Sequence, residues 1–307
     1  MGKYTKYRLY QKYETRGSQE AIPVYPNTFS IDGDGTMPVV IIEENSRDCG
    51  YTGDTQPIYR WYNMPIDKYY VCDECAANFK IKAVYTGGMT YSAACDNSTE
   101  LTSGETRPSD YRITAMTSAV IGSCVTVVGY RALYSCTSLS SLTIGNNVVT
   151  IEDYAFFYNR SLTSVVIPNK VTSIGDYAFQ VCRSLTSVTI GNSVATIGSN
   201  AFGTCSGLTS LNLPNSVSSI GSQAFQSCSS LTSVTIGNGI TSIGSQAFGS
   251  CSGLTSITIN ATTPPTLGSN ALNLSSDCPI YVPAASVETY KAASGWSSYA
   301  DRIQAIP

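Results

Sequence analysis

The chain has 307 residues and a formal net charge of −3 at pH 7, a length that accommodates two or three structural units. The weak negative charge excludes an electrostatic case for nucleic-acid binding, and the lack of an apolar run of about 18 residues excludes a membrane span. The sequence contains no histidine, which excludes Ser-His-Asp and Cys-His catalysis, imidazole metal ligands and histidine pH switches. We therefore expect neither an enzyme nor a cofactor.

Residues 1–13 alternate Lys and Arg with Tyr and contain no apolar segment. This pattern predicts no Sec signal peptide, so the sequence allows synthesis in the cytoplasm without Sec export. A surface location then requires either that a leader was removed or that the protein leaves the cell as part of a phage particle.

Residues 1–112 form a region of distinct composition, with 13 of the 21 tyrosines, 12 Lys and Arg and 15 Asp and Glu. Turn signals at residues 33–35 and 85–88 and short alternating runs predict one or two small β modules, divided near Cys49. The expected strands are Lys6–Tyr13, Pro38–Glu43, Pro57–Tyr62, Asn78–Tyr85 and Tyr111–Met116.

Cys72 and Cys75 have the only spacing in the chain that is typical of a metal site. Together with Cys49 and Cys95 they could supply four thiolates for zinc, but the second C-x-x-C pair of such sites is missing. A zinc site, a disulfide and unpaired structural thiols all remain open, and we expect no metal.

From Met116 onward the chain repeats one unit of 23 residues, with a degenerate first copy. The unit reads L-x-x-V-x-I-G-N-x-V-x-x-I-G-x-x-A-F-x-x-C. Its first column is Leu139, Leu162, Leu185, Leu208, Leu231 and Leu254. Its last column is Cys136, Cys182, Cys205, Cys228 and Cys251, with Asn159 as the exception.

This period predicts a solenoid, because one strand with a single apolar face cannot bury that face alone and stacked copies can. Gly-Asn or Pro-Asn supplies the turn after each strand, and the Ala-Phe pair fills the interior on the return side. The column cysteines lie between buried Phe and Leu positions. We expect them to be buried, reduced and inert.

The repeat unit resembles the BspA-like, Treponema-type leucine-rich repeat. The resemblance implies a mainly β fold with a right-handed solenoid. We place this solenoid at residues 113–274, after the Tyr-rich β region that composition indicates at 1–112. The resemblance also implies binding rather than catalysis, because proteins of this family are mostly surface proteins that bind host or matrix partners.

Residues 275–307 are expected to close the end of the solenoid. Pro283 precedes a predicted short helix at residues 284–294, and Trp296, Tyr299 and Ile303 can cover the last apolar edge. This tail resembles the C-terminal cap of BspA-like proteins of Bacteroidetes, which implies that such a bacterium or one of its phages is the source.

The strand face is predicted to carry a regular hydroxyl lattice. Its threonines are Thr163, Thr186, Thr189, Thr209, Thr232, Thr235, Thr255 and Thr258. Threonine packs well on stacked strands, and its hydroxyl bonds across them, which is the structural interpretation. A surface that binds a glycan or another regular lattice is the functional alternative.

The first units differ from the later ones, because residues 184–276 contain no Asp, Glu, Lys or Arg. We define the Tyr/Arg patch as Tyr130, Arg131, Tyr134, Tyr154, Phe157, Tyr158, Arg160, Tyr177 and Arg183. Exposed Tyr and Arg are typical anchors of protein interfaces. The patch is expected either to dock the N-terminal region or to bind a foreign partner.

These patterns predict a non-enzymatic attachment protein at the cell surface or in a virion, which binds a protein or a cell-surface glycan. In this interpretation residues 1–112 anchor the protein, through homo-oligomerisation or virion assembly, and the solenoid presents the binding surface. The alternative is a purely structural component of a phage virion or of its assembly.

Overall fold

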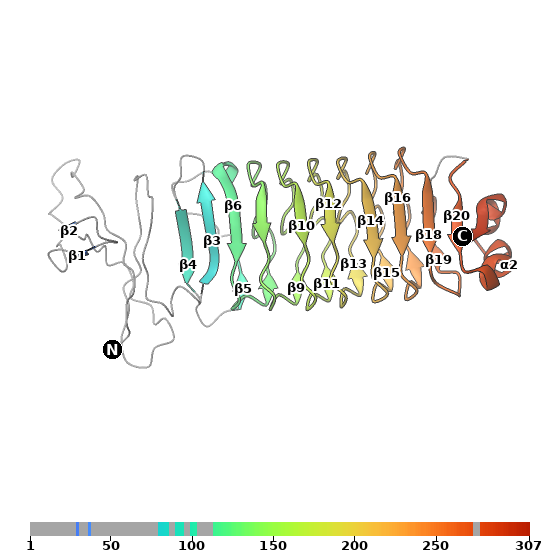
Figure 1. Ribbon diagram of the computed structural model, residues 1–307, viewed down its shortest axis with the longest axis horizontal. Helices are drawn as coiled ribbons and strands as arrows, with labels where there is room; N and C mark the ends of the chain where they lie inside the picture. The colour runs from blue at the N-terminus through green and yellow to red at the C-terminus, as the bar shows by residue number, and fades with distance from the viewer. Residues whose placement is uncertain are drawn as a thin grey trace.

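The computed structural model describes residues 29–30, 36–37, 79–85, 90–94, 99–102, 113–272 and 277–307. Between residues 113 and 272 the chain winds into a β-solenoid, which Figure 1 shows as a row of coils along the long axis of the molecule. Each coil supplies a longer strand to one side, a short strand to a second side and a loop that closes the coil. The mainly β solenoid expected from the repeat is confirmed.

From β8 onward the longer strands begin two residues after the first leucine of each repeat, whereas β6 begins at Met116, the equivalent of that leucine in the degenerate first copy. They are β6 (Met116–Ile121), β8 (Ser141–Thr143), β10 (Ser164–Val166), β12 (Ser187–Thr189), β14 (Ser210–Leu213), β16 (Ser233–Ile236) and β18 (Ser256–Ile259). In β10 the buried Val165 stands between the exposed Ser164 and Val166. This alternation places one face of each strand in the core and the other in solvent.

The short strands form one parallel sheet of eight. They are β5 (Glu100–Leu101), β7 (Val127–Val128), β9 (Thr150–Ile151), β11 (Ser173–Ile174), β13 (Thr196–Ile197), β15 (Ser219–Ile220), β17 (Ser242–Ile243) and β19 (Thr266–Leu267). Ile174 pairs with Ile197, so each repeat column becomes a row of equivalent side chains along the axis.

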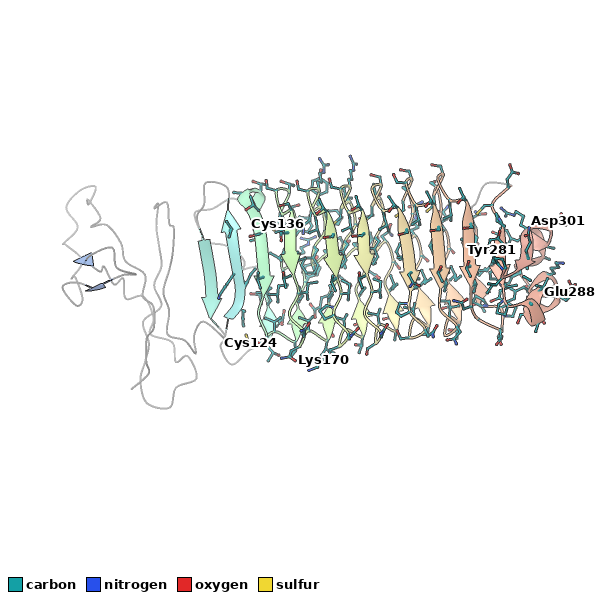
Figure 2. All side chains as sticks on the ribbon, in the orientation of Figure 1. Cys124, Cys136, Lys170, Tyr281, Glu288 and Asp301 are labelled. Atoms are coloured by element: carbon teal, nitrogen blue, oxygen red, sulfur yellow. The ribbon has the colours of Figure 1, made fainter. Side chains whose placement is uncertain are left out.

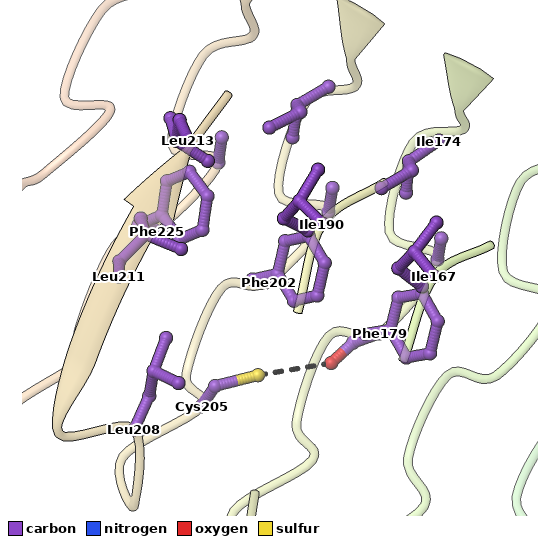
Figure 3. Packing of buried hydrophobic residues seen from close by; sticks show 14 of the residues in the cluster. Ile167, Ile174, Phe179, Ile190, Phe202, Cys205, Leu208, Leu211, Leu213 and Phe225 are labelled. Atoms are coloured by element: carbon purple, nitrogen blue, oxygen red, sulfur yellow. Dashed lines mark hydrogen bonds between the residues drawn. The ribbon is translucent and has the colours of Figure 1, made fainter. Parts of the chain in front are cut away.

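The interior is filled by the same side chain in successive coils. Phe156, Phe179, Phe202, Phe225 and Phe248 are fully buried, and successive rings stack with centroids 4.8 to 5.4 Å apart. Figure 3 shows three of these rings beneath the apolar ends of the longer strands. The core is therefore continuous from coil to coil, as expected for a solenoid.

The third side, from the end of each short strand to the residue that follows the cysteine column, is called the loop face here. A second ladder of backbone hydrogen bonds joins its coils: the N–H of Tyr154 donates to the carbonyl of Asp176 (2.9 Å) and that of Phe156 to Ala178 (2.8 Å). Tyr154 and Tyr158 have positive φ angles of 57° and 66°, and equivalent positions in the other coils do too. Because this backbone region is unfavourable for side-chain-bearing residues, the repeated ladder is what holds the loop in shape.

Three strands before residue 113 extend the sides of the solenoid. Strand β3 (Phe79–Tyr85) pairs antiparallel with both β4 (Thr90–Ala94) and β6, and β5 pairs in parallel with β7. A separate antiparallel pair joins β1 (Phe29–Ser30) to β2 (Thr36–Met37). The β3–β4 pair therefore covers the first edge of the longer-strand side, which would otherwise present unpaired backbone groups.

The strand expected at Asn78–Tyr85 is confirmed as β3. The strand expected at Tyr111–Met116 is wrong, because residues 113–115 form a 3-10 turn, η2 (Ile113–Ala115), and β6 begins at Met116. The reason is tertiary, since β6 takes its register from pairing with both β3 and β8. The other expected strands, Lys6–Tyr13, Pro38–Glu43 and Pro57–Tyr62, and both expected turns lie wholly or partly outside the described residues. The divisions at residues 112 and 274 stay predictions.

The C-terminal segment closes the solenoid as expected. Strand β20 (Ile280–Val282) pairs with β18, and β21 (Ile303–Ala305) pairs with β20. Between them lie η3 (Ala284–Ser286), α2 (Val287–Ala292) and η4 (Ser297–Arg302). Trp296 and Tyr290 are fully buried, and they donate hydrogen bonds from the indole N–H and the hydroxyl to carbonyls of the last coil. Large buried rings with satisfied polar ends make this an effective cap.

Within the described residues, no helix has the length and apolar character that crossing a membrane requires.

Candidate binding surface on the loop face

The structure places the Tyr/Arg patch on the loop face of the first coils. Its members lie in the turns that follow β7, β9 and β11, where the repeat leaves positions open beside the buried Ala-Phe pair. Tyr130 is 51% exposed, and Arg131, Arg160 and Arg183 are also exposed. The other patch members are half-buried against one another.

The aromatic rings of the patch form one connected group. Tyr154 stacks on Tyr177 with ring centroids 4.7 Å apart, because the two residues occupy the same column of adjacent coils. Tyr154 also contacts Phe157 at 5.6 Å, and Phe157 contacts Tyr134 at 5.0 Å and Tyr158 at 5.8 Å. Contacts of this kind stabilise aromatic pairs beyond their buried area, so the rings provide a rigid base.

Two arginines lie against these rings. The guanidinium carbon of Arg131 is 4.9, 5.0 and 5.4 Å from the ring centroids of Tyr130, Tyr134 and Tyr154. That of Arg160 is 4.0 Å from the ring centroid of Tyr158, and Arg160 also donates a hydrogen bond to the Tyr158 hydroxyl oxygen. Cation–π contacts hold both side chains in place, and a guanidinium carries five N–H donors.

The carboxylates of the same coils are engaged elsewhere. Oδ1 of Asp153 accepts the backbone N–H of Asp176, and Oδ1 of Asp176 accepts that of Ser199. Oε2 of Glu152 accepts the backbone N–H of Tyr130. These acids satisfy backbone donors at the start of each loop rather than the charges of the patch arginines.

Desolvation by the surrounding residues, with a smaller contribution from Tyr177, raises the pKa of Tyr154 above its usual value. A tyrosine hydroxyl is already protonated near pH 7 at its usual pKa, so the raised pKa of Tyr154 extends its capacity to donate a hydrogen bond to higher pH.

The described strands before residue 113 do not account for the patch. Strands β3 and β4 extend the longer-strand side, and β5 extends the short-strand sheet. Glu100 of β5 lies against Gly129, the residue before Tyr130, and the N–H of Gly129 donates to the carbonyl of Leu101. Most of residues 1–112 lies outside the described residues, so the docking interpretation stays a prediction.

The loop face of the later coils carries an amide ladder that we did not predict from the sequence. Gln180 donates to Asn200 (3.2 Å), Asn200 to Gln223 (3.3 Å) and Gln223 to Gln246 (3.2 Å), each through side-chain amides. Asn200, Gln223 and Gln246 continue the column of Tyr154 and Tyr177. The 23-residue spacing was the signal that could have identified this ladder.

The hydroxyl lattice is present on the strand side, and much of it bonds within the protein. The Thr186 hydroxyl donates to the carbonyl of Thr163 (3.0 Å), and Thr209, Thr232 and Thr255 repeat the bond. Each of these hydroxyls donates a hydrogen bond to a backbone carbonyl of the preceding coil, which agrees with the structural interpretation of the lattice. The next outward column contains Thr189, Thr235 and Thr258. It continues through Tyr281, labelled in Figure 2, to Gln304 in the cap.

The cysteine column is buried, as predicted. Its members, Cys136, Cys182, Cys205, Cys228 and Cys251, have at most 3% exposure, and the last four are free thiols. The thiol of Cys205 donates to the carbonyl of Phe179, the dashed line in Figure 3, and Cys251 to that of Phe225. Desolvation raises the pKa of Cys205 and Cys228 and raises that of Cys251 to about 11.

Asn159 takes the cysteine position in one coil. It is fully buried, and neither side-chain amide atom has a hydrogen-bond partner. A buried amide without partners is costly, so this coil departs from the repeat at a stability cost.

The weak zinc candidates Cys49, Cys72, Cys75 and Cys95 lie outside the described residues. Among the residues that the structure describes, no group of three or more His, Cys, Asp or Glu side chains is arranged to hold a metal ion.

Solved structures similar to this chain are bacterial leucine-rich repeat proteins. One from T. pallidum is 28% identical with a TM-score of 0.46, over 50% of this chain and 73% of its own. One from Eubacterium ventriosum is 27% identical with a TM-score of 0.48, and the similarity covers 62% of this chain and 49% of the other. One from Bacteroides ovatus is 22% identical with a TM-score of 0.39, and the similarity covers 65% of this chain and 61% of the other. No protein of curated function matches the chain.

The profile of the family described as "BspA type Leucine rich repeat region" matches residues 109–159 and 155–278, in six copies. The match covers more than half of the 307 residues and coincides with the solenoid. The chain belongs to the BspA-type leucine-rich repeat family.

Proposed function

We propose that this is a non-enzymatic attachment protein of a cell surface or a virion, and that the Tyr/Arg patch is its binding surface. A solenoid presents an extended surface on a rigid scaffold, which suits binding. Residues 1–112 anchor the protein in its assembly, and the first coils contact a protein or a surface glycan.

One observation carries this proposal: the side chains typical of binding anchors gather on one face of the first coils and form one contacting group. Tyr and Arg are enriched at energetically dominant interface positions because they combine contact area with directed hydrogen bonds. A rigid group of rings loses little side-chain entropy on binding, which favours affinity.

The experiment compares purified variants on a panel of matrix proteins and an array of surface glycans. The patch variant, Y154Q/Y158S/R160S, takes at each position a residue that later coils carry there, namely Gln223, Ser227 and Ser229. The solenoid should therefore remain folded, with an unchanged circular dichroism spectrum. We expect binding to the protein or glycan that the unmodified chain selects to be lost.

The lattice variant, T209V/T232V/T255V, is the matched control on the strand side of the later coils. It keeps the β-branched shape and removes three hydroxyls, so we expect binding to be retained. Loss of binding in the lattice variant but not in the patch variant would place the site on the hydroxyl lattice and refute the proposal.

A further inference from the structure

We infer that the Tyr/Arg patch recognises an acidic polysaccharide, whose sulfate or carboxylate groups bind the guanidinium groups of Arg160 and Arg183. This inference rests on the proposed function, because it names the class of partner for the same surface.

Arg160 and Arg183 form a basic column at the end of the loop face. They stand 23 residues apart, and the N–H of Ser184 donates to the carbonyl of Arg160 (3.2 Å), which fixes the two coils side by side. Adjacent strands lie about 4.8 Å apart, so two like charges are held on neighbouring coils. Two like charges in facing positions repel each other and destabilise the protein. An anion bound between the two guanidinium groups would replace this repulsion with attraction.

No carboxylate neutralises this column within the described part of the chain. Neither Arg160, Arg183 nor Arg131 forms an ion pair there. The acids of the same coils lie at the opposite end of the loop, where Asp153 and Asp176 accept backbone N–H groups. The basic and acidic ends of the loop face are thus separated.

The uncharged later coils leave the basic column uncompensated on that side. Residues 184–276 contain no charged side chain, so the next acid in sequence after Arg183 is Asp277. Charges separated by more than about 8–10 Å are screened at physiological salt, so the local column rather than the net charge of −3 decides what binds there.

Of the two arginines in the column, the guanidinium group of Arg160 is held against an aromatic ring, as is that of Arg131 elsewhere in the patch. The Tyr158 ring and hydroxyl position Arg160, and three rings position Arg131. A planar guanidinium binds sulfate or carboxylate through two parallel hydrogen bonds, a geometry that lysine does not offer. Contacts that hold the side chain before binding reduce the entropy cost of recognition.

The rim of the column favours a polysaccharide over an acidic peptide. Residues with hydroxyl groups adjoin the column in sequence: Tyr158 before Arg160, and Thr163 and Thr186 at the start of the longer strands that follow. Their oxygens can accept hydrogen bonds from sugar hydroxyls. Among the described residues, the exposed aliphatic side chains Val120, Val149, Val166 and Ile306 all lie outside the patch. A peptide partner would lack the apolar pockets that usually anchor it.

The experiment measures binding of the full chain to immobilised heparin, hyaluronan and poly-glutamate by surface plasmon resonance at low ionic strength. Heparin carries sulfate and carboxylate, hyaluronan carries carboxylate alone, and poly-glutamate tests an acidic peptide. We expect heparin, hyaluronan or both to bind, with added salt weakening the interaction. R160Q/R183Q should weaken it at least about tenfold, since two charge-assisted contacts are lost.

The matched control is K170Q/K291Q, which removes the same number of positive charges. Lys170 follows β10 whereas Arg160 precedes it, and Figure 2 shows Lys170 at the lower edge of the solenoid and Glu288, the partner of Lys291, in the cap. We expect this variant to bind within about twofold of the unmodified chain, because exposed single charges contribute little. R160K/R183K keeps both charges without the planar fork and should bind with intermediate strength.

Three results would overturn the inference: no binding to either polysaccharide, an equal loss in the lysine control, or tighter binding of poly-glutamate. The proposed function can hold even if this inference fails, and the patch variant separates the two cases. In that case the patch variant still loses binding to the partner selected on the panel. If that variant also kept its partner, both proposals would be wrong.

Discussion

Replacing Asn159 by cysteine should stabilise the protein. Asn159 interrupts the cysteine column, because all the remaining coils of the repeat have a buried cysteine at this position. Neither side-chain amide atom of Asn159 has a hydrogen-bond partner. In the neighbouring coil the Cys182 thiol donates to the carbonyl of Phe156 at 3.5 Å. A cysteine at position 159 would face the equivalent carbonyl, that of Leu133.

The size of the effect follows from the amide. An unsatisfied buried polar group costs about 1–3 kcal/mol, and the substitution removes it while keeping a small side chain in the same space. We therefore expect the free energy of unfolding of N159C to rise by about 1–3 kcal/mol. The reverse change in the next coil, C182N, should lower it by at least a comparable amount.

The assay is equilibrium unfolding in urea under reducing conditions, followed by circular dichroism, with an unchanged m-value as the test that both variants unfold similarly. Stability of N159C equal to or below that of the unmodified chain would refute the reasoning. It would mean that the amide is satisfied in solution, for example by a buried water.

The remaining predictions concern the core and the cysteine column. F202A should lower the free energy of unfolding by about 3–5 kcal/mol in the same assay, because Phe202 is fully buried between Phe179 and Phe225; a loss below about 1 kcal/mol would contradict a packed core. Without denaturant, Cys182, Cys205, Cys228 and Cys251 should resist a thiol reagent over the time in which unfolded protein reacts fully, and rapid labelling would contradict their burial. Burial raises the pKa of Cys251 from 9.0 to about 11, so the unfolded thiol ionises first and stability should fall by up to about 3 kcal/mol between pH 9 and 11. C251A should show a weaker fall over that range, and an identical pH dependence would exclude this thiol as a cause.

The solenoid could be predicted from the sequence because each structural column is also a column of the repeat. The alternation around Val165 and the Ala-Phe and cysteine positions determine which side chains face the core. The cap could be predicted as well, since Trp296 and its neighbours are the large apolar residues available to cover the last coil.

Features that depend on pairing between non-repeating segments could not be predicted. The register of β3 against β6 is set by tertiary contacts and left no period in the sequence, so the start of β6 was misplaced. The patch residues were recognisable as exceptions to the repeat. The diagonal contacts that join them, such as Tyr154 with Phe157 and Arg131 over three rings, arise only from the coiled backbone.

The central claim is that binding lies in the first three coils and that the later coils are interchangeable. Repeat stability is approximately a sum of neighbour terms, so removal of one whole unit, residues 208–230, should leave a folded protein. The decisive measurement compares this deletion with the patch variant for binding to the partner selected on the panel. We predict that the deletion binds like the unmodified chain and that the patch variant does not. Loss of binding in the folded deletion, with binding retained by the patch variant, would place recognition in the later coils and contradict the claim.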